Sequence, residues 1–207
     1  MNLFIGIILS YLIGAIPSAY IVVKLVKGTD IREHGSGNVG ATNVFRVLGK
    51  KFGVMVLLLD IIKGIIPVVL VTDMLGLSAI VEQIILAFCA VIGHNWTVFL
   101  NFKGGKGVAT SLGVLIGLTI KIASIRIVLL ITLLTWGFFF VVFGFVSLAS
   151  LLAALSLPLT MVFTDQHVEL VLMGVLFCLF IIIRHRANIR RLFAGQEPRV
   201  NILSLFN

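Results

Sequence analysis

The sequence predicts an all-α, polytopic integral membrane protein with about seven transmembrane segments, the N-terminus outside and the C-terminus cytoplasmic. Hydrophobic residues make up 60% of the 207 residues, well above the roughly 45–50% of a soluble domain. They occur in long blocks rather than in the alternating segments of about ten residues that form a transmembrane β-barrel. The blocks leave no room for a separate soluble domain, so we expect a single integral-membrane domain over residues 1–207.

Seven apolar segments are expected to form the spans. They lie at about residues 3–23, 53–72, 79–93, 108–120, 127–145, 147–163 and 168–183. The segment at 108–120 is shorter than the about 20 residues of a full span and could be a short or re-entrant helix, while 127–163 could form one long span. The first block has no basic residue before it and Lys24 and Lys27 after it. A secretory signal has the reverse charge order, so we expect this block to be retained.

The basic residues favour one topology. With seven spans and the N-terminus outside, 13 of the 16 basic residues fall in three cytoplasmic segments, at 24–52, at 94–107 and from 184 onward. The positive-inside rule requires this distribution, and it leaves Lys121 and Arg126 outside. The three long polar segments then share one face, where they could build one site together. The rule also accounts for the net charge of +8, and the chain lacks the basic domain with interleaved aromatic residues that nucleic-acid binding requires.

The first polar segment is HGSGNVGATNVFRVLGK, residues 34–50. Its glycines permit positive φ and a close approach of a ligand to the backbone, and successive N–H groups in such a turn form an anion-binding nest. A helix that begins near Thr42 or Asn43 would add a helix N-terminus, which also favours phosphate. The alternative is a flexible cytoplasmic loop. The candidate site residues of this segment are Ser36, Gly37, Asn38, Thr42, Asn43 and Arg46.

The second polar segment is FKGGKGVATSLG, in which Gly104, Gly105 and Gly107 surround Lys106. It is not a Walker A motif, because Leu100 stands where that motif has its first glycine and Gly107 stands where it has Ser or Thr. A glycine-rich turn, a lysine and a helix start nevertheless suit a phosphate group. The alternative is a basic loop whose glycines serve only to turn the chain.

The third polar segment, RHRANIRRLFAGQE, directly follows the last span. His185 and Asn188 are three residues apart and would share a helix face. Four arginines surround them, and Glu197 could pair with one of these arginines and hold the tail in place. An amphipathic juxtamembrane helix that binds anionic lipid headgroups is the alternative, which explains the arginines better than it explains His185 and Asn188.

Asp60 and Lys63 lie inside the second span at a spacing of three residues. Ionised groups in a membrane are costly, so we expect an ion pair that orients a site, with a purely structural pair as the close alternative. His94, at the end of the third span, is expected to be a hydrogen-bonded structural histidine. The cysteines, Cys89 and Cys178, are interpreted as packing residues, and we predict no metal site and no cofactor.

The three segments together resemble the bacterial acyl-phosphate-dependent glycerol-3-phosphate acyltransferases, the PlsY family. The matching stretches are GSGNVGATNVFRVLGKKFG (35–53), FKGGKGVATSLG (102–113) and RHRANIRRLFAGQE (184–197). LDIIKGIIPV and FVSLAS also look like the family, so the resemblance covers nearly the whole chain. One departure is Thr97, because the family usually has proline there. Neither a Gly-x-Ser-x-Gly elbow around Ser36 nor a histidine followed five residues later by aspartate occurs.

The resemblance implies an enzyme of the bacterial inner membrane whose active site faces the cytoplasm. It would move a fatty acyl group from acyl-phosphate to the 1-hydroxyl of sn-glycerol-3-phosphate, giving lysophosphatidate and inorganic phosphate, the first step of phospholipid biosynthesis. Ser36 and Arg46 are expected to be essential, the second motif to bind glycerol-3-phosphate, His185 and Asn188 to lie in the substrate site, and Glu197 to support structure. The expected partners are these two substrates and membrane lipid, with no nucleic acid and no obligate protein partner.

An acyl-phosphate is a mixed anhydride with a good leaving group, so it needs charge neutralisation and alignment more than a strong base. We therefore predict direct attack by the glycerol hydroxyl, with Arg46 and Lys106 holding phosphates and Ser36 steadying the acyl carbonyl or the leaving phosphate. An acyl-enzyme on Ser36 is the rival mechanism. A transporter of a phosphorylated small molecule is a rival function, although such proteins often have internal repeats, of which none is convincing here. A lipid-binding scaffold is a third possibility.

Overall fold

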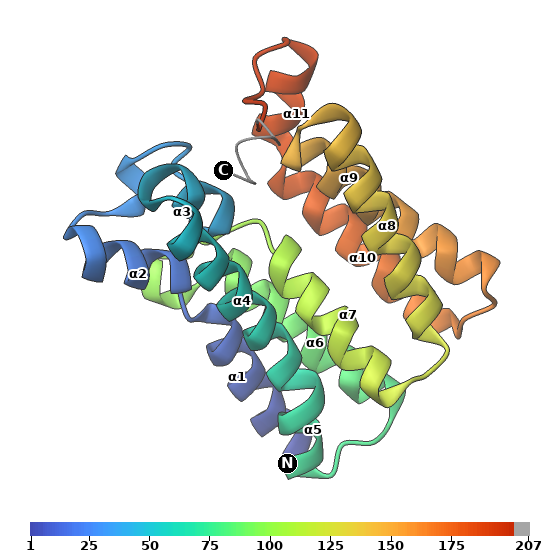
Figure 1. The fold of residues 1–207 in the computed structure, drawn as a ribbon. Coiled ribbons are helices and arrows are strands. Elements are labelled where there is room, and N and C mark those ends of the chain that lie inside the picture. The colour runs from blue at the N-terminus through green and yellow to red at the C-terminus, as the bar shows by residue number, and fades with distance from the viewer. Residues whose placement is uncertain (201–207) are drawn as a thin grey trace. The chain divides into compact units, whose positions relative to one another are not determined.

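The computed structural model describes residues 1–200, and within that range all regular elements are helices. The chain packs into two compact units, residues 1–121 and residues 122 onward. The prediction of a single domain stays a prediction. The helices of the first unit, drawn from blue to yellow-green in Figure 1, are α1 (Asn2–Ala15), α2 (Ser18–Lys27), η1 (Ile31–Glu33), α3 (Ala41–Leu48), α4 (Lys50–Ile66), η2 (Pro67–Val71), α5 (Thr72–Leu75), α6 (Ile80–Asn95), η3 (Val98–Leu100) and α7 (Val108–Lys121).

Glycines set the spacing of the long helices in the first unit. Where α1 packs on α6, a Cβ on Gly14 would lie 2.0 Å from the carbonyl oxygen of Ala90. Where α4 packs on α7, a Cβ on Gly113 would lie 2.0 Å from the carbonyl oxygen of Ile61. Membrane helices gain little from hydrophobic burial against each other, so small residues that let backbones approach are a main source of association. The short helix α7 is held firmly by this contact.

Two prolines shape the spans of this unit. Pro17 separates α1 from α2, so the predicted first span at 3–23 is interrupted in its second half, because proline cannot donate the helical hydrogen bond. Pro67 opens the π-helical stretch η2 between α4 and α5. Proline has no backbone N–H to donate, and the π-helical turn accommodates this, so the helix continues into α5 without a loop.

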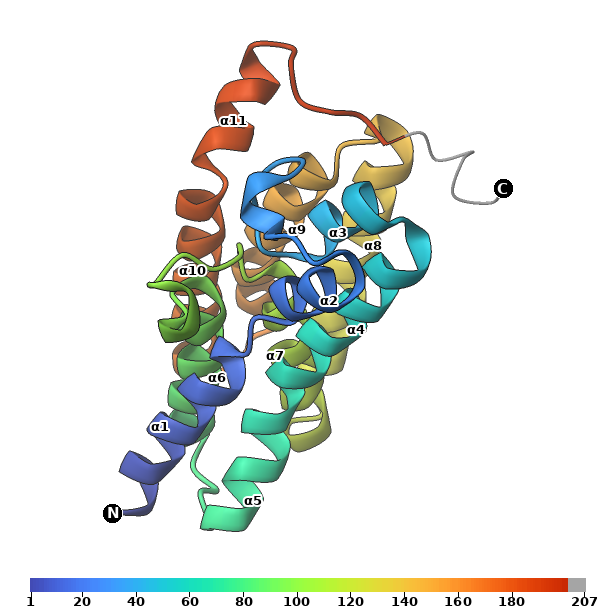
Figure 2. The same ribbon diagram turned by 90° about the vertical axis from the view of Figure 1, so that its left-hand side faces the viewer.

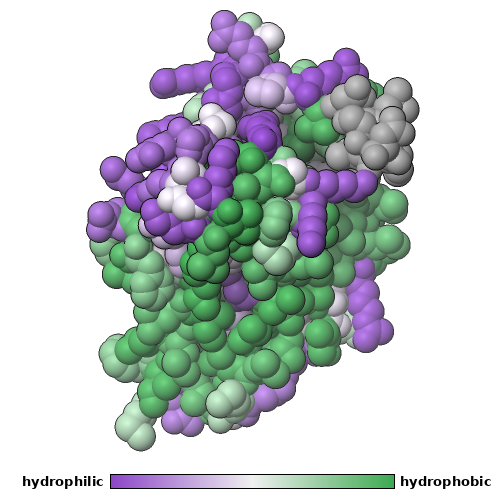
Figure 3. Space-filling model, turned by 60° about the vertical axis from the view of Figure 1, so that its left-hand side comes forward, coloured by the Kyte–Doolittle hydropathy of each residue, from purple (hydrophilic) through white to green (hydrophobic). Residues whose placement is uncertain are grey.

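The surface of the first unit is apolar along its helices. Large hydrophobic side chains such as Leu58, Leu59 and Ile62 on α4 are 41–53% exposed, as lipid-facing residues must be. Figure 3 shows this face: hydrophobic residues cover the helices, and hydrophilic residues gather toward the end that carries α2 and α3. At the far end of α7, Lys121 forms an ion pair with Asp73.

The second unit contains α8 (Ile125–Phe143), α9 (Val146–Phe163), α10 (Val168–Arg184) and α11 (Arg186–Phe193). Gly144 ends α8 with φ +74°, which glycine adopts without strain. The predicted stretch at 127–163 is therefore two helices, and α9 packs on both α8 and α10. After α10 the chain bends by 63° into α11, as Figure 2 shows in orange and red.

The helices agree with the predicted apolar segments, with small shifts of their ends. Among the described residues five helical stretches are long and apolar enough to cross a membrane, and three of them join successive elements: Asn2–Lys27, Lys50–Leu75, Ile80–Leu100, Ile125–Phe143 and Val146–Phe163. A sixth results if α10 and the bent α11 form one span. The remaining predicted segment corresponds to α7, which has 14 residues. The chain is thus an all-helical integral membrane protein, whereas seven full spans and the orientation of the termini stay predictions.

Candidate active site

The first motif forms a tight loop before α3. Gly35 and Gly37 have φ values of +59° and +68°, so positive φ occurs at both, whereas Gly40, the third glycine of the motif, has an extended backbone with φ −164°. Asn43 is fully buried and holds this loop from inside: its Oδ1 accepts from the N–H of Ser36 at 2.9 Å, and its Nδ2 donates to the carbonyls of His34 and Ile31. The amide of Asn43 thus orders the loop, and its direct contact with a substrate stays a prediction.

Helix α3 begins slightly earlier than predicted. Its N-cap is Gly40, with an extended backbone and no side-chain cap, rather than Thr42 or Asn43. The carbonyl of Gly40 accepts the N–H groups of Asn43 and Val44, as an N-cap carbonyl does, and glycine is one of the residues that this position favours. The loop and helix leave Ser36 and Arg46 exposed to solvent, where a soluble substrate can reach both.

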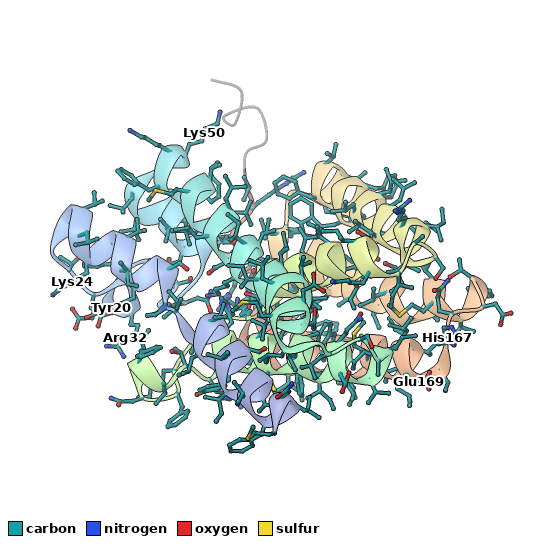
Figure 4. The ribbon with its side chains drawn as sticks, turned by 90° about the horizontal axis from the view of Figure 1, so that it is seen from below. Tyr20, Lys24, Arg32, Lys50, His167 and Glu169 are labelled. Atoms are coloured by element: carbon teal, nitrogen blue, oxygen red, sulfur yellow. The ribbon has the colours of Figure 1, made fainter. Side chains whose placement is uncertain are left out.

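An ion pair fixes the start of the first motif. Asp30 accepts a hydrogen bond from the N–H of Arg32 and caps η1, and its carboxylate binds the Arg32 guanidinium at 2.6 Å. The hydrogen bond from Arg32 holds the pKa of Asp30 below its ordinary value, and the same contact raises the pKa of Arg32. The guanidinium lies 5.7 Å from the ring centre of Tyr20 on α2. Figure 4 shows Tyr20, Lys24 and Arg32 at one end of the unit.

The second motif packs tightly on the C-terminal end of α6. The N–H of Gly104 donates to the carbonyl of Asn95, and the N–H of Gly105 donates to the carbonyl of His94. The backbone N–H groups of Gly104 and Gly105 therefore already donate to α6. A phosphate bound by this motif would have to use N–H groups that follow Gly105, including those at the start of α7. Gly107, with φ +80°, turns the chain into α7. Lys106 is half-buried between these glycines.

The first and second motifs meet in space. A Cβ on Gly105 would lie 2.5 Å from the carbonyl oxygen of Val39 in the first motif. Both residues line a small cavity of ≈ 10 Å³, enough for about one water molecule. The expectation that these two segments lie together is confirmed, and only glycine leaves the space for this contact.

Beneath the two motifs lies the predicted ion pair. Lys63 Nζ is 2.8 Å from Asp60 Oδ1, and both side chains are at least 94% buried. Lys63 also donates to the carbonyl of Ile16 at 2.8 Å, in the break between α1 and α2. The neighbouring carbonyl, that of Ala15, accepts a hydrogen bond from Thr97. Polar side chains therefore bind two of the carbonyls at the proline break, and the carbonyl of Ile16 also accepts the N–H of Ser18.

Thr97 and His94 make buried contacts that their places in the sequence do not predict. Thr97, which stands where the resembling family usually has proline, is 1% exposed and links η3 to the end of α1. His94 is 7% exposed, and its Nδ1 lies 3.8 Å from Asp60 Oδ1. The sequence indicates them only weakly, through a threonine where the resembling family usually has proline and a histidine at the end of a span. Their partners, Ala15 and Asp60, are distant in the sequence.

The third motif belongs to the second unit and centres on a buried carboxylate. Glu197 accepts hydrogen bonds from Ser147 at 2.7 Å, Asn188 at 2.6 Å and Arg191 at 2.8 Å. The predicted pairing of Glu197 with an arginine is confirmed. His185 lies at the junction of α10 and α11, 3% exposed, with its Nδ1 2.8 Å from the carbonyl of Ile181. That this motif completes one site with the other two stays a prediction.

Glu197 should make the second unit sensitive to acid. Burial raises the pKa of Glu197, but the hydrogen bonds from Asn188, Ser147 and Arg191 outweigh it and bring the pKa below the ordinary 4.5. Its contribution is therefore present above the pKa of the unfolded chain and is lost as the pH falls through the lower, folded pKa. We expect Glu197→Gln to lower the free energy of unfolding by about 1–3 kcal/mol near pH 7.

Thermal unfolding in detergent, followed from pH 7 down to about pH 3, measures this effect. The difference in unfolding temperature between wild type and Glu197→Gln should become smaller as the pH is lowered. Glu169→Gln, at an exposed position on α10 that is labelled in Figure 4, is the matched control and should unfold like wild type. Equal stability of Glu197→Gln and wild type at pH 7 would contradict the role of the carboxylate.

The long apolar helices and the buried ion pair define the chain as a polytopic helical membrane protein with a polar, glycine-rich site at its surface. The family model for glycerol-3-phosphate acyltransferases matches residues 4–195, and the chain belongs to this enzyme family. The family places the protein in phospholipid biosynthesis.

Individual relatives agree along the whole chain. The glycerol-3-phosphate acyltransferase of Endomicrobium trichonymphae is 47% identical over 95% of this chain and 94% of its own length. That of Fusobacterium nucleatum subsp. nucleatum is 43% identical over 96% and 98%. A crystal structure of PlsY (YgiH), an integral membrane glycerol 3-phosphate acyltransferase in its glycerol 3-phosphate form, matches with a TM-score of 0.88 at 40% identity, covering 100% of this chain and 99% of that one.

Proposed function

We propose that this protein transfers a fatty acyl group from acyl-phosphate to the 1-hydroxyl of sn-glycerol-3-phosphate, and releases lysophosphatidate and inorganic phosphate. The observation that carries the proposal is the contact of the first two motifs at Val39 and Gly105. It gathers an exposed hydroxyl, Ser36, and two cations, Arg46 and Lys106, in one unit. Both proposed substrates carry a phosphate, which cations and helix N-termini bind well.

The related structures support the acceptor and the product. PlsY has been crystallised in a glycerol 3-phosphate form and in a lysophosphatidic acid form, which match this chain with TM-scores of 0.88 and 0.84. The donor rests on chemistry: an acyl-phosphate needs neutralised charge and alignment more than a strong base. The first two motifs supply cations and a hydroxyl, which suits such a donor.

In the proposed reaction the 1-hydroxyl oxygen of glycerol-3-phosphate attacks the acyl carbonyl carbon. The new C–O ester bond forms, the bond between the carbonyl carbon and the phosphate oxygen breaks, and the departing phosphate takes the hydroxyl proton. Arg46 and Lys106 hold the phosphates, and the Ser36 hydroxyl stabilises the developing negative charge. Gly37, Asn38 and further small residues of the two motifs would line the substrates, and the third motif would add His185 and Asn188.

The acyl-enzyme alternative differs in its kinetics. If Ser36 carried the acyl group, the two half-reactions would give ping-pong kinetics and an acyl adduct on the protein. Direct transfer requires both substrates to be bound at once and gives sequential kinetics. Mass spectrometry of protein quenched after mixing with acyl-phosphate alone separates the two, and an adduct on Ser36 would rule out direct transfer.

The test of the whole proposal uses purified full-length protein in sealed vesicles of both orientations. With acyl-phosphate in the membrane and radiolabelled glycerol-3-phosphate added outside, we expect labelled lysophosphatidate without any other protein. Because the site is proposed to face the cytoplasm, inside-out vesicles should be active and right-side-out vesicles inactive until they are opened. No product from opened vesicles would refute the enzyme proposal, and product from an acyl thioester but not from acyl-phosphate would refute the donor.

A further inference from the structure

Three titratable side chains are buried together below the second motif. Asp60, Lys63 and His94 are 2%, 5% and 7% exposed, and they come from two helices, α4 and α6. Asp60 Oδ1 lies 2.8 Å from Lys63 Nζ and 3.8 Å from His94 Nδ1. Charged groups in a membrane protein interior are costly and usually serve a function. None of the three belongs to the glycine-rich motifs.

Helix packing alone does not explain this cluster. The contacts of α4 with α7 and of α1 with α6 already depend on close glycine contacts, such as those of Gly113 and Gly14. Replacing a buried ion pair by apolar residues of similar volume is often neutral or even stabilising. Because apolar residues can often replace such a pair, its presence points to a role in fixing the position of other groups, beyond the carbonyl of Ile16 that Lys63 binds.

His94 connects the cluster to the second motif. Its carbonyl accepts the N–H of Gly105 at 3.1 Å. On the other side of the residue, a Cβ on Gly105 would lie 2.2 Å from His94 Nε2. The imidazole thus lies between Asp60 and the glycine pair that precedes Lys106. The small cavity described above is lined by Asp60, Lys63, His94, Gly104 and Gly105. A shift of the ring would shift the loop.

Lys63 connects the cluster to the first motif. It holds the carbonyl of Ile16 at the start of α2. Val23 of α2 in turn belongs to one buried apolar cluster with Ile31 and Val39, which flank the first glycine loop. The buried ion pair is therefore linked to both motif loops.

We propose that Asp60, Lys63 and His94 are positioning residues that set the second glycine motif, and thereby Lys106, for binding the phosphate of glycerol-3-phosphate. Asp60 orients the imidazole, His94 sets Gly104 and Gly105, and Lys63 locks Asp60 to the break between α1 and α2. The inference rests on the proposed function, and it assigns the cluster to binding of the acceptor rather than to chemistry on the acyl group.

The test is a comparison of kcat and KM in purified, monodisperse variants. Asp60→Asn and His94→Leu should raise the KM for glycerol-3-phosphate about tenfold to 100-fold, because small misplacements of a binding group have effects of this size. The KM for acyl-phosphate and kcat should change less than about threefold, because a binding contact made equally in the ground and transition states affects KM alone. His94→Gln, which keeps a polar group near Asp60, should recover most of the wild-type KM.

Two further variants keep the test decisive. Lys121→Met breaks the ion pair with Asp73 at the other end of the same unit and should leave the KM for glycerol-3-phosphate unchanged. Gly105→Ala, whose Cβ would press on both His94 Nε2 and the carbonyl oxygen of Val39, should raise the same KM without removing a charge. If it folds, it covers the case that a charge variant does not.

Each contrary result has a distinct meaning. Folded Asp60→Asn, His94→Leu and Gly105→Ala proteins with a wild-type KM for glycerol-3-phosphate would overturn the positioning role and leave a structural cluster. A collapse of kcat in His94→Gln at unchanged KM would overturn it in favour of proton transfer by His94. If the wild-type protein itself makes no lysophosphatidate, the proposed function fails. If the wild type is active and the variants have its KM, only the positioning role fails.

Discussion

Ser36→Ala should lower kcat by at least about 10²–10³-fold, the loss expected when one donor to a developing oxyanion is removed. The Ser36 side chain is exposed on a loop whose shape depends on other residues. Its contact with Asn43 uses the backbone N–H of Ser36, at 2.9 Å, and alanine keeps that N–H. The variant therefore removes the hydroxyl and keeps the hydrogen bond from the backbone N–H to Asn43. The loss of activity can then be assigned to the hydroxyl.

Steady-state kinetics with acyl-phosphate and glycerol-3-phosphate, together with a thermal unfolding curve, measure this effect. The unfolding temperature of Ser36→Ala should equal that of wild type. Glu33→Gln, an exposed change in η1 of the same loop, is the control and should keep nearly full activity. If Ser36→Ala retained kcat within about threefold of wild type, the hydroxyl would have no part in transition-state stabilisation, and both mechanisms considered for this site would fail.

Gly113→Leu should prevent the first unit from folding. A Cβ at this position would lie 2.0 Å from the carbonyl oxygen of Ile61 and 3.1 Å from the Cα of Gly64. These are backbone atoms, which cannot rotate away as a side chain can, so α4 and α7 would have to separate. Overpacking of a core commonly costs about 1–3 kcal/mol, and we expect more here because a whole helix contact is lost. The same separation would move Asp60 and Lys63 on α4.

The yield of monodisperse protein in detergent and its unfolding temperature report this loss. Gly137→Leu is the matched control: it places the same side chain on α8, where a Cβ meets nothing within 4 Å. That variant should accumulate and unfold like wild type. Normal yield and stability of Gly113→Leu would show that the α4–α7 contact can relax, and that the close approach of the two backbones is not required for the fold.

The sequence correctly predicts the features that depend on neighbours along the chain. Long apolar blocks predicted membrane helices because a bilayer requires every backbone polar group to be paired within the helix. The spacing of Asp60 and Lys63 predicted their ion pair because residues three apart lie on one helix face. The glycines of the first motif predicted positive φ at Gly35 and Gly37, since other residues adopt it only with strain.

Local patterns predicted the helix start in the first motif less well. Thr42 and Asn43 are good N-cap residues, yet Gly40 takes that position. The side chain of Asn43 is used instead to fasten the loop from inside. The side chain of Asn43 could cap the helix or bind the loop, but not both, and its burial beneath the loop selects the second role.

By itself, then, the sequence determined that this chain is a helical membrane protein and which segments carry its polar motifs. Only the tertiary structure decided that His94 lies beside Asp60, that Thr97 holds the carbonyl of Ala15, and that Gly105 touches Val39. Each of these contacts joins residues at least 34 positions apart in the sequence, on elements whose relative position depends on how closely their helices approach. Helix periodicity fixes the face on which a residue lies, but the facing partner is set by the depth and register of packing, which here depend on glycines whose missing side chains leave room for a neighbouring backbone.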